Sequence, residues 1–361
     1  MTMIAPADLA HCRAAIRTGS LSFHAASRLL PPSVRDPAFA LYAFCRLADD
    51  AVDEHADKAR AVLSLRDRLD LAFAGTPRNA PADRAFAAIV QDFDMPRALP
   101  EALLEGLAWD ADERRYDTLS GVLSYSARVA AAVGAMMCVL MRVRDADTLA
   151  RACDLGLAMQ LTNIARDVGE DARAGRLYLP LDWFRAADLD PDAFLRNPLP
   201  SRDIRAMTRR LLREADRLYA RSESGISALP LSSRPGIFAA RFVYAAIGGA
   251  VARNGHDSIT RRARTGKPLK LAMLALSGVR AAASSVLPRP ATLFARPEPE
   301  VAFLVDAAAR RSAQTGRGDA LLRLLQQLEA QDHARRAPQY RALHIPLHLD
   351  GSRMEGNRLP G

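Results

Sequence analysis

The sequence predicts an all-α protein, and three observations support this fold class. Apolar residues recur at helical spacing over several long stretches, alternating runs of β-branched residues are scarce, and Pro or Gly interrupts the chain between the stretches. Hydrophobic residues make up 49% of the 361 residues, so the chain can bury a large core. We therefore expect a helical protein of one or two domains.

Three stretches carry the clearest helix signals. Residues 57–75 close on Gly75, residues 124–143 are rich in alanine with one apolar face, and residues 201–229 form a long basic amphipathic stretch that begins at the good N-cap residue Ser201. In the first stretch, the apolar residues near helical spacing are Leu63, Leu65, Leu69 and Phe73. Each stretch is long enough to predict a helix of several turns.

Clusters of Pro and Gly predict the loops and one boundary. We expect loops near residues 31–36, 75–81, 94–100, 172–200 and 230–235. The composition changes near residue 288, where the stretch "PRPATLFARPEPE" is rich in proline. We therefore divide the chain into a helical domain, residues 1–287, and a C-terminal extension, residues 288–361, that holds one more amphipathic helix and a polar tail.

The charge balance and the aromatic content narrow the choice of partners. The formal net charge is +9, which suits nucleic acid, an anionic membrane surface or an anionic substrate. Aromatic residues make up only 6% and the basic residues are scattered, so nucleic acid is the least favoured partner. The four cysteines form no CxxC motif and predict free thiols in a reducing compartment.

The hydropathy pattern predicts neither an export signal nor a clean membrane span. Asp8 and Arg13 lie where a signal peptide needs an unbroken apolar run. The nearest candidate for a span, residues 269–287, is interrupted by Lys270 and Arg280. We interpret it as a buried helix, with a helix that rests on a membrane as the alternative.

The stretch "QLTNIARDVGED", residues 160–171, places four polar side chains on one helix face. Gln160, Asn163, Asp167 and Asp171 follow one another at steps of three and four, which is the spacing of a single face. A surface helix usually mixes charges on such a face. Here the face holds only oxygen acceptors, and no counter-charge lies in register.

A second acidic face occurs in "YAFCRLADDAVDE", residues 42–54. Asp49 and Asp53 are four residues apart, and Asp57 continues the face. One acidic face is usually just solvated, but two faces with apolar flanks indicate helices packed in a core, where uncompensated carboxylates are costly. Carboxylates four residues apart also repel one another along a helix. We therefore expect a cation to bind between the two helices.

The ligand types favour a hard cation and a phosphorylated substrate. Oxygen ligands without His or Cys suit Mg²⁺ or Mn²⁺ rather than Zn²⁺, and Mg²⁺ usually bridges carboxylates to a substrate phosphate. Without such a bridge, a carboxylate and a phosphate about 4 Å apart repel by about 4 kcal/mol per charge pair at an effective dielectric constant of about 20. Arg46 and Arg166 lie inside the motifs and are candidate diphosphate ligands, whereas Arg173 is more typical of a surface ion pair.

The two motifs resemble the signature motifs of the squalene/phytoene synthases, which join two prenyl diphosphates head to head. The resemblance covers about residues 12–275 and is greatest to the phytoene synthases of photosynthetic bacteria. It implies the isoprenoid synthase helical bundle, with a central cavity lined by the two acidic helices. It leaves the extension after residue 288 unmatched.

The resemblance also implies roles for individual residues. The metal ligands are Asp49, Asp53, Asn163, Asp167 and Asp171, with Mg²⁺ or Mn²⁺ as the cofactor and no NADPH. The catalytic residues are Arg46, Arg166, Tyr178 and Tyr244. The substrate-binding residues are Ser20, Ser22, Phe23, Tyr42, Arg46, Gln160, Arg176 and Arg262. For Ser20 and Ser22 the alternative is a helix N-cap, and for Tyr244 it is a place in the core.

The implied reaction condenses two geranylgeranyl diphosphates through prephytoene diphosphate to phytoene, in carotenoid biosynthesis. One alternative is a relative that uses farnesyl diphosphate and makes squalene, hydroxysqualene or dehydrosqualene. Others are a terpene cyclase with one diphosphate substrate, and a basic scaffold without activity, which the acidic faces disfavour. We expect residues 124–141 to form an apolar cavity wall that keeps water from the cationic intermediates.

The sequence also carries expectations about the length of the substrate's carbon chain and about where the protein lies in the cell. In residues 19–30, Ala26 and Ser27 lie on one helix face with Phe23. These small side chains predict either a cavity deep enough for a twenty-carbon tail or close helix packing. We also expect the protein in the cytoplasm, in peripheral contact with the inner face of the membrane through the extension or residues 269–287. A downstream phytoene desaturase is a further candidate partner.

Overall fold

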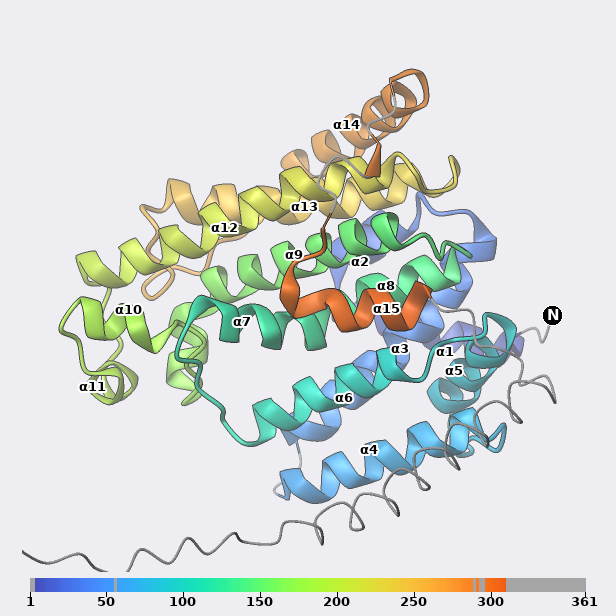
Figure 1. Ribbon diagram of the computed structural model, residues 1–361, viewed down its shortest axis with the longest axis horizontal. Helices are drawn as coiled ribbons and strands as arrows, with labels where there is room; N and C mark the ends of the chain where they lie inside the picture. The colour runs from blue at the N-terminus through green and yellow to red at the C-terminus, as the bar shows by residue number, and fades with distance from the viewer. Residues whose placement is uncertain (1–3, 55–56, 288–289, 292–295, 310–361) are drawn as a thin grey trace, which may run out of the picture. The chain divides into compact units, whose positions relative to one another are not determined.

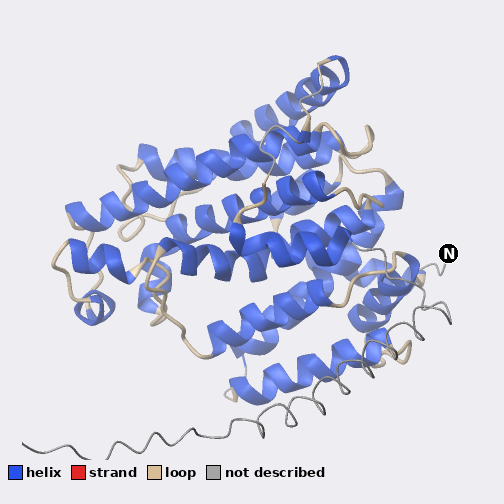
Figure 2. Cartoon of the chain, viewed as in Figure 1, coloured by secondary structure: helices blue, strands red, loops and turns tan. Residues whose placement is uncertain are grey.

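The computed structural model describes residues 4–54, 57–287, 290–291 and 296–309, and these ranges form an all-helical fold with no strand (Figures 1 and 2). The predicted fold class is therefore confirmed. In chain order the elements are α1 (Pro6–Gly19), α2 (Leu21–Ser27), α3 (Pro32–Glu54), α4 (Lys58–Phe73), α5 (Pro81–Asp92), α6 (Ala98–Ala111), α7 (Leu119–Ser126), η1 (Ala127–Ala131), α8 (Ala132–Leu140), α9 (Ala146–Arg173), α10 (Leu181–Ala186), α11 (Pro191–Arg196), α12 (Arg202–Ile226), α13 (Arg234–Arg253), α14 (Lys267–Val286), η3 (Pro299–Val301) and α15 (Ala302–Ala309).

The two helix ends predicted from capping residues are confirmed. The Ser201 side chain accepts from the Ile204 backbone N–H at 3.2 Å and caps α12. Gly75 follows α4 with a φ of 77°, a backbone conformation that favours glycine. Within α4, however, Leu63 is 63% exposed, while Leu65 and Leu69 are buried.

Several predicted loops are wrong because prolines begin helices in this chain. The expected loop at residues 31–36 is the first part of α3, which starts at Pro32 and continues through Pro37. The range 172–200 contains the end of α9 and the short helices α10 and α11. A proline in the first turn has no N–H to leave unpaired, so it favours a helix start as readily as a loop.

Asp57 does not continue the acidic face of α3. The helix ends at Glu54, and the Asp57 carboxylate instead accepts from the Arg60 N–H at 2.9 Å as the N-cap of α4. The carboxylate thus satisfies one of the unpaired donors of a helix start. The first acidic motif is therefore restricted to α3.

Helix α9 carries the second acidic motif through the middle of the bundle. It packs against α12, α13, α8, α15 and η1, and most of its length is buried (Figure 1). Its approach to η1 needs Gly156, since a Cβ there would lie 2.6 Å from the Ala131 Cα. The π-helical turn η1 joins α7 to α8, so the alanine-rich stretch is one helical run with a local widening.

The described part of the extension packs on the bundle. Residues of α15 are buried against α8 and α9, η3 packs on α7 and η1, and the Arg144 guanidinium donates to the Ala308 carbonyl at 3.0 Å. The predicted helix at residues 319–336 and the polar tail lie outside the described residues. The division of the chain at residue 287 remains a prediction.

Three helical segments in the described ranges are long and apolar enough to cross a membrane: Leu119–Leu140, α13 and α14. Half or more of the most apolar window is buried in the first two, but only 17% of it in α14. The interpretation of residues 269–287 as a buried helix is therefore wrong. The four cysteines are free thiols, as expected.

Candidate active site

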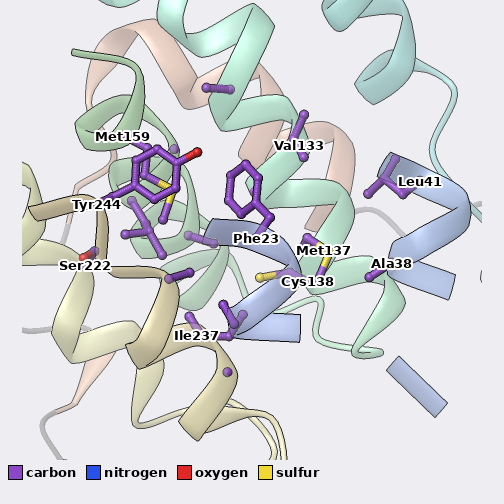
Figure 3. A pocket seen from close by; sticks show the side chains of 18 of the residues that line it. Phe23, Ala38, Leu41, Val133, Met137, Cys138, Met159, Ser222, Ile237 and Tyr244 are labelled. Atoms are coloured by element: carbon purple, nitrogen blue, oxygen red, sulfur yellow. The ribbon is translucent and has the colours of Figure 1, made fainter. Parts of the chain in front are cut away.

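An apolar cavity of about 370 Å³ lies inside the bundle, between α2, α3, η1, α8, α9, α12 and α13 (Figure 3). One wall is formed by the stretch predicted for it, through Val129, Ala130, Val133, Gly134, Met137, Cys138 and Met141. The volume is within the usual range for a small-molecule site. The lining provides few polar groups, which suits a hydrocarbon chain rather than a polar metabolite.

Two aromatic rings face one another in this cavity. The Phe23 and Tyr244 rings lie with their centroids 5.0 Å apart at an interplanar angle of 32° (Figure 3). Burial raises the pKa of Tyr244 above its usual range, so the hydroxyl stays neutral. Tyr244 is therefore shielded from bulk solvent and lines the cavity. It is both a core tyrosine and a cavity tyrosine, the two interpretations that the sequence left open.

Ser20 stands at the start of α2. Its side chain accepts from the Phe23 backbone N–H at 3.3 Å, which confirms the N-cap alternative for this residue. Ser22 lies in the first turn of α2 and is half-buried. The role of the two hydroxyls toward a diphosphate stays a prediction.

The small residues of α2 line the cavity and also lie at a close helix contact. Ala26 and Ser27 line the cavity together with Phe23. The same helix also approaches α13 closely, because a Cβ on Gly236 would lie 2.5 Å from the Leu30 Cδ2 and 3.2 Å from the Ala26 carbonyl oxygen. Their effect on substrate length stays a prediction.

The second acidic motif begins at the rim of the cavity. Gln160 and Asn163 both line it, and the Asn163 Nδ2 donates to the Gln160 Oε1 at 3.3 Å. The Asn163 Oδ1 is buried and has no hydrogen-bond partner among the described residues. An orphaned buried oxygen is costly unless a ligand pairs with it.

Two arginines bind the next residue of the motif. Asp167 receives two hydrogen bonds from its neighbour Arg166, and the Arg262 Nε donates to its Oδ1 at 2.9 Å. Arg262 also reaches Glu170 at 3.0 Å. Asp167 is therefore paired although no counter-charge lies in register on its helix face, because one partner is the adjacent residue and the other lies in a distant loop.

The loop that carries Arg262 is fixed against α9. The Ser258 Oγ donates to the Ala165 carbonyl at 2.6 Å, and the Gly169 N–H donates to the Ser258 carbonyl at 3.1 Å. A Cβ on Gly169 would lie 2.6 Å from the Ile259 Cα, so this contact requires glycine. The Arg173 guanidinium donates to the Gly169 and Ile259 carbonyls, which gives it a structural role beyond the surface ion pair that we expected.

An arginine also pairs with part of the first acidic motif. Arg46 pairs with Asp50 at 2.5 Å and lies 3.7 Å from Asp49. Asp53 lies on α3 four residues after Asp49, and its side chain is outside the described residues. Tyr42 lies one turn before Arg46, lines the cavity, and has its pKa raised by burial.

A cluster of tyrosines around one carboxylate was not predicted. The Tyr125 and Tyr178 hydroxyls each donate to Asp110 at 2.7 Å, and their rings stack with centroids 5.1 Å apart. The only sequence signal was an aspartate near the end of the mostly apolar helix α6, "ALPEALLEGLAWDA", which also carries Glu101 and Glu105. Tyr178, predicted at the diphosphate, is thus held by Asp110.

Asp171 is electrostatically strained. The pKa of its carboxyl is raised to about 7. Burial is the largest cause, the charges of Asp167, Glu170 and Asp110 act in the same direction, and the charge of Arg176 opposes them. A nearby divalent cation would favour the ionised carboxylate.

The donor set therefore fits a hard divalent cation. The orphaned Asn163 oxygen and the crowded Asp171 carboxylate lie on one helix with Asp167, and all three offer oxygen ligands. Within the described ranges, no three His, Cys, Asp or Glu side chains form a preassembled metal cluster. Ligands from α3 and α9 would therefore need to come together around the ion.

Known proteins of one enzyme family are similar to this chain over most of its length, and a solved structure shares its fold. The squalene/phytoene synthase family profile matches residues 16–269. A phytoene synthase of Cereibacter sphaeroides is 68% identical over 340 residues, which cover 91% of this chain and 96% of that protein. A 15-cis-phytoene synthase of a Paracoccus species is 42% identical, over 73% of this chain and 88% of its own length. A crystal structure of a dehydrosqualene synthase in complex with ligand superposes with a TM-score of 0.71 and 29% identity, over 77% of this chain and 97% of that one.

Proposed function

The chain belongs to the squalene/phytoene synthase family, and from this premise we propose how its cavity and its two acidic helices act together. Its reaction is phytoene synthesis, a prenyl transfer that joins two geranylgeranyl diphosphates through prephytoene diphosphate in carotenoid biosynthesis. The observation that carries this function is an apolar cavity lined by Gln160 and Asn163 at the start of the second acidic motif, one turn before Asp167 and its two arginine partners.

The proposed cofactor is Mg²⁺, which Mn²⁺ can replace. Its ligands are Asp49 and Asp53 on α3 and Asn163, Asp167 and Asp171 on α9. When bound, the ion supplies Lewis-acid stabilisation of the departing diphosphate. The unpaired Asn163 oxygen and the raised pKa of Asp171 support this assignment.

The arginines of the rim exchange partners when substrate binds. Arg46, Arg166 and Arg262 are held on carboxylates in this structure. A diphosphate carries more charge than one carboxylate and offers oxygens in the fork geometry that guanidinium groups prefer. Transfer of the guanidinium groups to the diphosphate would release the carboxylates for the cation. Arg176, next to Asp171, would act in the same way.

The cavity protects the reacting carbons. Its apolar wall keeps water away from the allylic cation, which would otherwise be hydrolysed. The Phe23 and Tyr244 rings present π-faces to the same space, and such faces attract cations. The chemistry ends in proton loss, so we expect no requirement for NADPH.

The site of action is the cytoplasmic face of the membrane. Both the twenty-carbon tails and the hydrocarbon product are insoluble in water, and the net charge of +9 favours an anionic lipid surface. A desaturase that accepts phytoene from the same membrane is the proposed downstream partner.

A product analysis tests the function. Purified protein is incubated with Mg²⁺ and either geranylgeranyl or farnesyl diphosphate, and the hydrocarbon is identified by mass spectrometry. Phytoene from the longer substrate is the expected result. Squalene, hydroxysqualene or dehydrosqualene from farnesyl diphosphate alone would favour the alternative, whose fold the dehydrosqualene synthase shares. A cyclic product from one diphosphate would indicate a terpene cyclase.

A further inference from the structure

Helix α14 turns small residues toward the bundle and large apolar residues toward solvent, which is the opposite of an ordinary surface helix. Its buried residues are Ser277, Ala281 and Ser284, whereas Leu271 is 69% and Val279 66% exposed. A helix on a globular protein normally turns its large apolar residues to the core. The reversal indicates that the solvent-facing side of α14 is adapted to an apolar surrounding.

The outward face of α14 is an unbroken apolar stripe. It consists of residues that lie within one arc of the helix, most of them three or four positions apart and all of them exposed: Pro268, Leu271, Ala272, Ala275, Val279, Ala282 and Val286. The charged residues of the helix, Lys267, Lys270 and Arg280, lie off this stripe. A stripe of this length on a water-soluble surface is an interaction site rather than a scatter of single apolar residues.

Contacts on the opposite face hold α14 in this orientation. The Arg234 guanidinium donates to both the carbonyl oxygen and the hydroxyl of Ser284 at 3.2 Å. Arg280 forms a 2.5 Å ion pair with Glu223 of α12. Because these bonds fix the inner face on α12 and α13, the apolar stripe cannot turn toward the core.

The basic residues around α14 indicate that its apolar partner is negatively charged at its surface. Residues 258–297 contain no acidic residue. Arg261, Arg264 and Lys267 are exposed just before or at the first turn of the helix. Basic side chains beside an apolar helix face match an anionic bilayer, where the cations meet phosphates and the stripe meets acyl chains. A purely apolar protein partner would not call for this charge.

The apolar stripe of α14 lies on the far side of a helix that lines the cavity. Helix α13 lines the cavity through Ile237, Ala240 and Tyr244, and α14 packs on α13 at the outer edge of the bundle (Figure 1). A bilayer that contacts α14 would therefore lie one helix away from the prenyl chains.

We propose that α14 is the membrane-docking element and that it lies in the interface of an anionic bilayer with the stripe toward the acyl chains. The inference rests on the proposed peripheral attachment and goes beyond it by naming the helix, its face and the lipid charge. A second copy of this chain and the chain's own residues 310–361 are the competing occupants of the stripe.

Flotation with vesicles tests the proposal on the full chain. Wild type is expected to float with phosphatidylcholine vesicles that contain phosphatidylglycerol, and less with phosphatidylcholine alone. Leu271→Gln combined with Val279→Gln should weaken binding at least about tenfold. Leu63→Gln on α4, a leucine that is 63% exposed, is the matched control and should bind like wild type. Equal flotation of wild type and the α14 variant would overturn the proposal, and so would a wild type that stays with the soluble fraction.

A probe on the stripe distinguishes the occupants. Val279→Cys is labelled with a polarity-sensitive dye, with wild type labelled in parallel because Cys45 is only partly buried. Emission should shift to the blue when the anionic vesicles are added. Emission that is already blue without vesicles would place the chain's own residues or a second copy on the stripe, and would overturn lipid docking. Phytoene formation in detergent micelles is measured for each variant, so that loss of docking is separable from failure of the proposed function.

Discussion

The Arg262 Nε donates to the Asp167 Oδ1 across 2.9 Å, although 95 positions of sequence separate the two residues. This contact joins the loop after α13 to the second acidic motif on α9. Arg166 binds the same carboxylate from the adjacent position, so two guanidinium groups share one aspartate. The arrangement keeps two guanidinium groups, paired with Asp167 and Glu170, beside the second acidic motif, where we propose that the substrate diphosphate binds.

Arg262→Gln is expected to lower kcat/KM for geranylgeranyl diphosphate by at least about tenfold, because a charged hydrogen bond to phosphate is worth about 1.5–3 kcal/mol. Arg262→Lys should restore part of the loss, since it keeps the charge but not the fork. Steady-state kinetics in detergent measures both. Arg185→Gln, which removes an exposed ion pair with Asp117, is the control. Normal kcat/KM in Arg262→Gln would contradict the role.

Removal of the cation or its ligands should abolish turnover. A chelator is expected to stop the reaction, and Mg²⁺ or Mn²⁺ to restore it. The variants Asp49→Asn, Asp53→Asn, Asp167→Asn and Asp171→Asn should each lose activity while they keep their helical circular dichroism. Asp203→Asn, in the exposed first turn of α12, is the control. Near-normal rates in two or more of the four would show that the metal assignment is wrong.

Asp110→Asn should destabilise the protein by about 1–3 kcal/mol, because the Tyr125 and Tyr178 hydroxyls would lose a charged acceptor. Urea unfolding measures the change. A double-mutant cycle with Tyr178→Phe tests whether the lost stability comes from this contact. If it does, the double variant should lose less unfolding free energy than the sum of the two single variants. Stability losses that simply add would show that Asp110 stabilises the protein through contacts other than the one with Tyr178.

Ser27→Phe should reduce turnover of geranylgeranyl diphosphate and spare farnesyl diphosphate, because the new ring would fill cavity depth next to Phe23. Product formation from each substrate measures the ratio. Leu29→Phe, at an exposed position just after α2, is the control. Equal loss on both substrates with a lower melting temperature would instead indicate overpacking, which costs about 1–3 kcal/mol.

Asp257 should contribute stability that is lost in acid. Burial acts to raise its pKa, but hydrogen bonds from Thr260 and Ile259 and the charge of Arg205 outweigh burial and lower it. A carboxyl whose pKa is lower in the folded state stabilises the fold above its unfolded pKa, and the stability disappears as pH falls through the folded pKa. Asp257→Asn should therefore lower the melting temperature near neutral pH and converge with wild type in strong acid. A constant difference across this range would contradict the assignment.

The local sequence determined the helices and both acidic faces. The face of α9 exists as predicted, and that of α3 exists without Asp57, because spacing of three and four residues is a property of one helix and needs no knowledge of its neighbours. The cap at Ser201 and the glycine end of α4 were readable for the same reason. The position of the alanine-rich stretch as a cavity wall was also confirmed.

Only the tertiary structure decided which groups meet. The pairing of Arg262 with Asp167, and of Asp110 with two tyrosines, joins residues from different elements, and no periodicity in the sequence relates them. The same holds for α14, whose apolar pattern predicted burial but whose small residues pack inward. Hydrophobicity specifies that a face avoids water, whereas the packing of neighbouring helices decides which side is available to cover it.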